Sequence, residues 1–153
     1  MTLNVAYTPE AHPGSTAPLA LLSRGLVQLL RHRAGRGPTK AKAFWAGDEA
    51  VLVLFGGGYT KAEETLWLEG RSETAMTYRR AVFGALEDDM RAVVEAAIER
   101  PVSAVLSCAH HDPDVMAAVF LLEPLGGSGS PDAGDWRGAG GPPAPPPTSD
   151  GAA

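Results

Sequence analysis

The sequence predicts an α+β fold, in which two hairpins form a four-stranded antiparallel sheet with helices packed on one face. Two pairs of strand-like segments, within 40–55 and 102–122, are each joined by a short turn. Amphipathic helical segments precede the first pair and separate it from the second. The expected order of elements is therefore α-β-β-α-α-β-β, in a single domain over residues 16–123.

The first helix is expected at about 16–34. Its leucines recur at three- and four-residue steps, as on the apolar face of an amphipathic helix. These positions are Leu19, Leu22, Leu26, Leu29 and Leu30. The helix should end at Gly35, which can adopt the left-handed conformation, and Pro38 cannot continue it.

The first hairpin is expected to pair 40–46 with 50–55 across the turn at 47–49. Residues 40–46 alternate in polarity, as in a half-buried strand, whereas 50–55 are continuously apolar, as in a central strand. The three glycines at 56–58 lack the spacing of a phosphate-binding loop, so they predict a flexible joint between strand and helix.

A short helix should follow that joint. Thr60 is placed to cap its first turn, and Glu63 stands three residues later, where a capping-box carboxylate belongs. Leu66 and Trp67 supply the apolar side, and Gly70 ends the helix.

The longest helix is expected at about 72–99, before Pro101. Its apolar positions repeat at steps of three, four or seven: Met76, Phe83, Leu86, Met90, Val93 and Ala97. Its charged residues are assigned to the opposite, solvent-facing side: Arg79, Arg80, Glu87, Asp88, Arg91 and Glu95. One unbroken helix of this length would be roughly 42 Å long. It would extend beyond the sheet, and its uncovered apolar face predicts a homodimer.

The last two strands are expected at 102–109 and 115–122, joined by a turn at 111–114. Glycine, proline and serine dominate residues 124–153, which therefore predict a disordered tail. Residues 1–15 are expected to form a mobile N-terminus.

Composition predicts a cytoplasmic, globular protein, with 44% hydrophobic and 20% charged residues. A single cysteine, Cys108, excludes an internal disulfide framework and fits a reducing compartment. The N-terminal region has no apolar segment like that of a signal peptide. The best apolar window, 19–30, is shorter than the roughly 20 residues that span a bilayer.

Charge is distributed unevenly along the chain, although the net charge is −5. No acidic residue lies between Glu10 and Asp48, an interval rich in arginine and lysine. A basic surface around the turn at 35–38 is the predicted binding site for an anion or a partner, made of Arg31, Arg33, Gly35, Arg36, Gly37 and Lys40. Arginine is suited to bidentate contacts with phosphate or carboxylate, although a merely solvated basic face is the alternative.

Other chemistry is less well supported by the sequence. Cys108 and His110 share one face of a strand and could form a nucleophile pair, but no orienting third group is visible. His110, His111, Asp112 and Asp114 are interpreted as a polar turn, so no metal site and no cofactor are predicted. The pI near 5.3 argues against nucleic acid as a partner. A small enzyme and a nucleic-acid-binding module remain the two alternatives to a non-enzymatic protein.

Four features together resemble the MpsC-like family of small bacterial proteins, over residues 20–123. They are the Gly35-Arg36-Gly37-Pro38 turn, the Thr60-x-x-Glu63-x-x-Leu66 box, the Arg79-Arg80 helix and the closing hairpin through Phe120. The glycine joint at 56–58 and the tail depart from the family pattern.

The resemblance implies a non-enzymatic accessory or regulatory component of a sodium-translocating, membrane-potential-generating system, linked in some bacteria to inorganic-carbon uptake. The basic surface centred on Arg36 adds an anionic partner, which could be a membrane-protein loop, an acidic lipid or a phosphorylated metabolite. Together the two predict membrane transport proteins or an anionic ligand as partners, with peripheral membrane contact. No catalytic residue is carried over from it.

Overall fold

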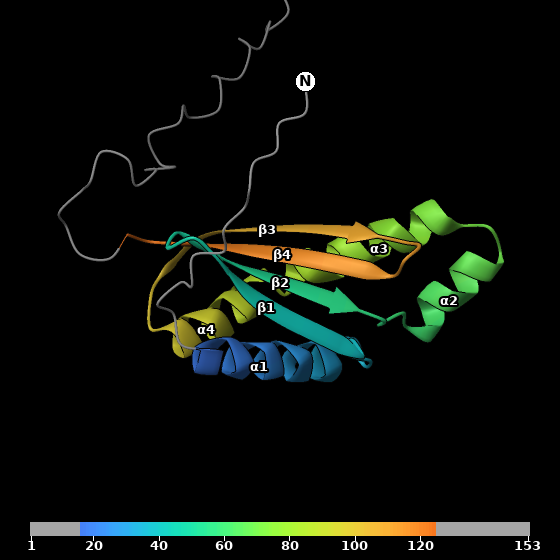
Figure 1. Ribbon diagram of the computed structural model, residues 1–153. Helices are drawn as coiled ribbons and strands as arrows, with labels where there is room; N and C mark the ends of the chain where they lie inside the picture. The colour runs from blue at the N-terminus through green and yellow to red at the C-terminus, as the bar shows by residue number, and fades with distance from the viewer. Residues whose placement is uncertain (1–15, 125–153) are drawn as a thin grey trace, which may run out of the picture.

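The computed structural model describes residues 16–124 (Figure 1). Its elements in chain order are α1 (Thr16–Ala34), β1 (Lys40–Ala46), β2 (Ala50–Gly56), α2 (Lys61–Leu68), α3 (Ser72–Ala85), α4 (Glu87–Ile98), β3 (Val102–His110) and β4 (Val115–Leu122). The predicted α+β class, the antiparallel sheet and its hairpins are confirmed. The predicted mobile segment 1–15 and, apart from Pro124, the predicted tail 124–153 lie outside the described residues.

The four strands form one antiparallel sheet in the order β1-β2-β4-β3. The two hairpins join through β2 and β4, where Val53 pairs with Ala118 and Phe55 with Met116. Both central strands consist almost wholly of apolar residues, as expected for strands with a neighbour on each side. The edge strand β1 alternates between exposed and half-buried residues, as its sequence predicted.

Helices α1, α3 and α4 pack on one face of this sheet and enclose the core. In Figure 1, α1 and α4 lie side by side beneath the strands, and α2 lies beyond the end of the sheet. The largest fully buried side chains are Phe120, Leu22, Leu26, Met90, Val51, Val53 and Val94. The contact between α1 and α4 is close, because a Cβ on Gly25 would stand 2.7 Å from Cγ1 of Val93.

The single long helix predicted at 72–99 is wrong, because the chain forms two helices that meet at Leu86. This residue has φ −101° and ψ 3°, and its N–H donates to carbonyls at the end of α3. Its side chain is buried, at 4% exposure, in the core shared by both helices. Three carboxylates, Glu87 to Asp89, follow in the first turn of α4, where the helix dipole favours negative charge. The expected rod is absent, and with it the reason for predicting a dimer through that helix.

Candidate functional site

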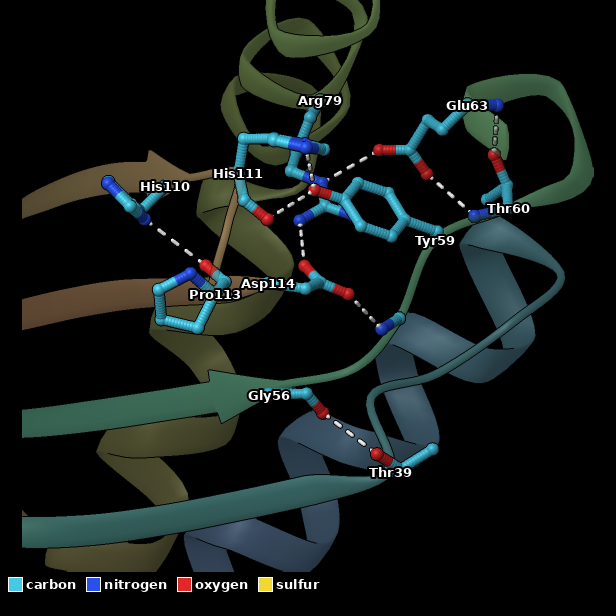
Figure 2. Close-up of polar contacts among 11 residues, drawn as sticks. Thr39, Gly56, Tyr59, Thr60, Glu63, Arg79, His110, His111, Pro113 and Asp114 are labelled. Atoms are coloured by element: carbon cyan, nitrogen blue, oxygen red, sulfur yellow. Dashed lines mark hydrogen bonds and ion pairs between the residues drawn. The ribbon is translucent and has the colours of Figure 1, made fainter. Parts of the chain in front are cut away.

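A buried group of charged residues lies where α2, α3 and the β3–β4 turn meet (Figure 2). Arg79 of α3 is 5% exposed and lies between two carboxylates. Its Nε donates to Oε1 of Glu63 at 2.7 Å, and its Nη1 donates to Oδ1 of Asp114 at 2.5 Å. We call Arg79, Glu63, Asp114 and Tyr59 the Arg79 cluster. The predicted solvent-facing position of Arg79 is wrong.

Glu63 belongs both to this cluster and to the cap of α2. Its Oε2 accepts from the N–H of Thr60 at 2.7 Å, while the Thr60 hydroxyl accepts from the N–H of Glu63 at 3.3 Å. This reciprocal pair is the capping box that the sequence predicted. One carboxylate therefore fixes the start of α2 and pairs with a residue of α3.

Asp114 anchors the glycine joint in a similar way. Its Oδ2 accepts from the N–H of Gly58 at 2.9 Å, and its backbone carbonyl accepts from the N–H of Gly57 at 3.2 Å. Gly57 has φ +62°, a conformation that favours glycine. The joint is thus a defined turn held by the second hairpin.

Tyr59 covers the cluster and ties it to His111. The phenol donates to the His111 carbonyl at 2.8 Å, and its oxygen lies 2.6 Å from Nδ1 of the same residue. The guanidinium carbon of Arg79 stands 4.1 Å from the centre of the Tyr59 ring. Burial, and after it the charge of Asp114, raises the pKa of Tyr59, so the phenol stays protonated at neutral pH.

The cluster holds a permanent positive charge inside the protein. Burial alone would lower the pKa of Arg79, but the contacts with Asp114 and Glu63 outweigh burial and raise it. A buried guanidinium between two carboxylates fixes the relative positions of three elements.

A cleft opens beside the Arg79 cluster, with a volume of about 50 Å³. Its walls come from α1, α2, α3, the sheet, the β3–β4 turn and the turns at 35–38 and 56–60. The apolar lining consists of Leu30, Ala34, Pro38, Phe55, Val82, Phe83 and Met116, and the polar lining includes Arg36, Thr60, Glu63, Tyr78, Arg79 and Asp114.

Arg36, the centre of the predicted basic surface, is at this cleft. Its Nη1 lies 3.2 Å from Oε1 of Glu64 on α2, and the side chains of Arg36 and Glu64 are 51% and 36% exposed. The hydrogen bond from Lys61, and after it the charges of Lys61 and Arg36, lower the pKa of Glu64, which therefore stays ionised. Such an exposed ion pair contributes little to stability and can exchange partners.

The other predicted site residues lie around Arg36 without lining the cleft. Arg31 is exposed on α1, and Arg33 pairs with Asp89 of α4 at 3.4 Å. Lys40 begins β1 and is exposed.

The two predicted glycines of this turn play different parts. Gly35 has φ +75°, the left-handed conformation expected at the end of α1. Gly37 is buried, and a Cβ there would stand 3.1 Å from Cβ of Arg31. These glycines shape the turn that presents Arg36.

The residues proposed for alternative chemistry lie apart from the cleft. Cys108 is exposed on β3, and Nδ1 of His110 lies 3.2 Å from the Pro113 carbonyl oxygen. Within residues 16–124, no three histidine, cysteine or acidic side chains are placed to hold a metal ion. Over the same residues, no helix is long and apolar enough to cross a membrane.

Fold and site together define a small α+β protein, with one helix-covered sheet face and an apolar cleft beside a buried arginine cluster. The chain belongs to the MpsC family, because the family model described as "Na+-translocating membrane potential-generating system (MpsC)" matches residues 19–124. Comparison with curated proteins and with solved structures finds no match.

Proposed function

We propose that this chain is a non-enzymatic accessory protein of a Na+-translocating, membrane-potential-generating system, and that its cleft holds a protein segment of a membrane component of that system. Membership of the MpsC family supports the link to such a system. The size and lining of the cleft support a protein segment as its occupant.

The cleft suits one side chain better than a free metabolite. Its volume of about 50 Å³ is far below the roughly 300 Å³ at which small-molecule pockets begin. Its walls are mainly apolar. Pockets of this kind in protein interfaces take a single anchoring side chain from the partner.

Arg36 adds a preference for an acidic neighbour of that anchor. Its side chain is half exposed and pairs only with Glu64 among the ion pairs of the described residues. A carboxylate of the partner could replace Glu64 and receive two parallel N–H donors. The proposed ligand is therefore an apolar side chain beside an acidic one, in a loop that projects from the membrane.

The Arg79 cluster prepares the cleft for binding. Arg79, Glu63 and Asp114 line the cleft while they join α2, α3 and the second hairpin. Walls that are already ordered lose little conformational entropy when a partner binds.

Binding to isolated membranes tests the proposal. The full chain is sedimented with membranes from cells that contain or lack the membrane components of the system, and with vesicles made from the same lipids. We expect binding only to membranes that contain the components. Equal binding to the lipid vesicles would instead make the chain a lipid-binding protein and contradict the proposal.

Two matched pairs of variants locate the contact. Ala34→Leu fills the cleft, whereas Ala20→Leu adds the same group to an exposed position of the same helix. Arg36→Ala removes the arginine at the cleft, whose side chain is 51% exposed. Arg33→Ala removes an arginine outside the cleft whose side chain is 52% exposed. Ala34→Leu and Arg36→Ala should each weaken binding by about tenfold or more, and their controls by less than about threefold. Equal effects within each pair would place the contact elsewhere.

Cys108→Ser separates this proposal from the enzyme alternative. Cys108 lies on β3, away from the cleft, so its loss should leave membrane binding unchanged. A loss of cellular function with binding intact would favour chemistry at Cys108 and His110 over a docking role.

A further inference from the structure

The sheet has a second face that no helix of residues 16–124 covers. The strand register places four cross-strand rows on it, and the second row is wholly apolar: Phe44, Leu52, Val119 and Leu106. Leu54 and Leu121 belong to the rows on either side. Phe44 is 43% exposed, Leu54 37% and Leu106 54%, values that are high for large apolar side chains.

We infer that this open face binds the same face of a second copy of the chain, which gives a two-fold symmetric dimer with two stacked sheets. This interface differs from the helix-mediated dimer that the sequence predicted. It also lies on the side of the sheet opposite the core helices and is independent of the proposed function.

The size of the face fits a weak, self-associating interface. Four strands at about 4.8 Å spacing and seven residues at about 3.4 Å rise give a plane of roughly 450 Å². This plane includes Lys40, Lys42 and His110 at one end, so its apolar part is smaller, and the largest apolar patch on a monomer of this kind is often an interaction surface. Stable dimers bury about 800 Å² per partner, so the dimer should dissociate on dilution.

Charge selects the second copy as the occupant and sets its orientation. At one end of β1, Lys40 and Lys42 lie on the open face, and at the other end the turn carries Asp48 and Glu49. Arg100 also lies at the acidic end, where it donates to the backbone carbonyl of Asp48. With two acidic residues and one arginine, that end of the face still carries a net negative charge.

A two-fold axis in the interface plane and perpendicular to the strands places β1 antiparallel to its own copy. The lysine end of each chain then faces the acidic turn of the other, and each favourable pair occurs twice. An axis parallel to the strands would instead place Lys40 and Lys42 against β3 of the other copy, where His110 lies on the open face. The first orientation is therefore the proposed one.

The chain's single cysteine lies on this face, so its accessibility to a labelling reagent measures whether the face is covered. Cys108 pairs in register with Ala117 in the third row and is exposed. The full chain is measured in reducing buffer by light scattering over a wide concentration range, and the rate of maleimide labelling of Cys108 is followed at the same concentrations. We expect the mass to rise from 15.9 kDa towards twice that value with concentration. Labelling should slow by about tenfold over the same range.

Matched variants identify the interface. Leu106→Lys should remain monomeric and be labelled rapidly at every concentration, whereas Leu21→Lys, at a 58% exposed position on α1, should dimerise normally. Lys40→Glu should weaken the dimer by about tenfold, and adding Asp48→Lys to it should restore the wild-type affinity.

Three results would overturn the inference. A mass of 15.9 kDa at all concentrations would show that the copies do not associate. Slow labelling that does not depend on concentration would show that another part of the same chain, such as residues 125–153, covers the face. A dimer that survives Leu106→Lys would lie on a different surface.

Discussion

Arg79 and Arg80 are neighbours in the sequence but lie in opposite environments. Arg79 is buried between Glu63 and Asp114, whereas Arg80 is exposed. The spacing could have predicted this, because Arg79 lies four residues after Ala75 and four before Phe83, and all three are buried on one side of α3. The sequence predicted the capping role of Glu63 correctly. The pairing of Glu63 with Arg79 depends on how α2 and α3 pack together, which cannot be predicted from a local sequence pattern.

The adjacent arginines provide a matched test at the residue scale. Arg79→Ala would leave two carboxylates without their cation, of which Glu63 is 4% exposed and Asp114 19%. We expect it to lower the free energy of unfolding by about 3 kcal/mol, at the lower end for a broken buried pair because Asp114 retains some solvent contact. Arg80→Ala should change it by less than about 0.5 kcal/mol. Denaturant titration measures both, and equal small effects would mean that the cluster does not hold the elements together.

At the scale of elements, the sequence predicted which segments form helices and strands, but it joined α3 and α4 into one helix. The apolar stripe continues through Leu86 in both arrangements, so periodicity alone cannot detect the break. Gly84 and the three carboxylates from Glu87 were the available signals, since glycine weakens a helix and acidic residues favour a new N-terminus.

Two helical glycines should respond to alanine in opposite directions. A Cβ on Gly84 would meet nothing within 4 Å, so Gly84→Ala should stabilise the fold by about 0.5–1 kcal/mol. A Cβ on Gly25 would stand 2.7 Å from Val93, whose branched side chain has few alternative rotamers. Gly25→Ala should therefore destabilise by about 1 kcal/mol despite the gain in helix propensity. Thermal unfolding of both variants checks the signs, and stabilisation by Gly25→Ala would show that α1 and α4 pack less closely than described.

At the scale of the whole molecule, the sequence predicted two hairpins and a helix-covered sheet without giving the strand order. The order β1-β2-β4-β3 brings the β3–β4 turn next to the glycine joint, and the cleft exists because of that juxtaposition. Arg36 could be singled out from the sequence because its turn and the absence of nearby acidic residues are local properties. The apolar walls of the cleft come from five separate segments, so no local property of the sequence could identify them.

Among residues 16–124, helices cover one face of this sheet and leave the other open. The molecule thus offers two surfaces of different chemistry: a narrow cleft with an arginine at its mouth, and a flat apolar face with lysines at one end and acids at the other. We propose the first for a membrane component of the system and the second for another copy of the chain.

Site-specific photo-crosslinking tests the central claim, that the cleft binds a membrane component, most directly. Tyr78 lines the cleft and is 41% exposed, and Phe44 lies on the open sheet face and is 43% exposed. Each is replaced in turn by p-benzoylphenylalanine, and cells that contain the membrane components are illuminated. We predict an adduct with a membrane component from position 78 and an adduct with a second copy of the chain from position 44. If position 78 forms no adduct with a membrane component, or if that adduct forms equally from position 44, the claim is wrong.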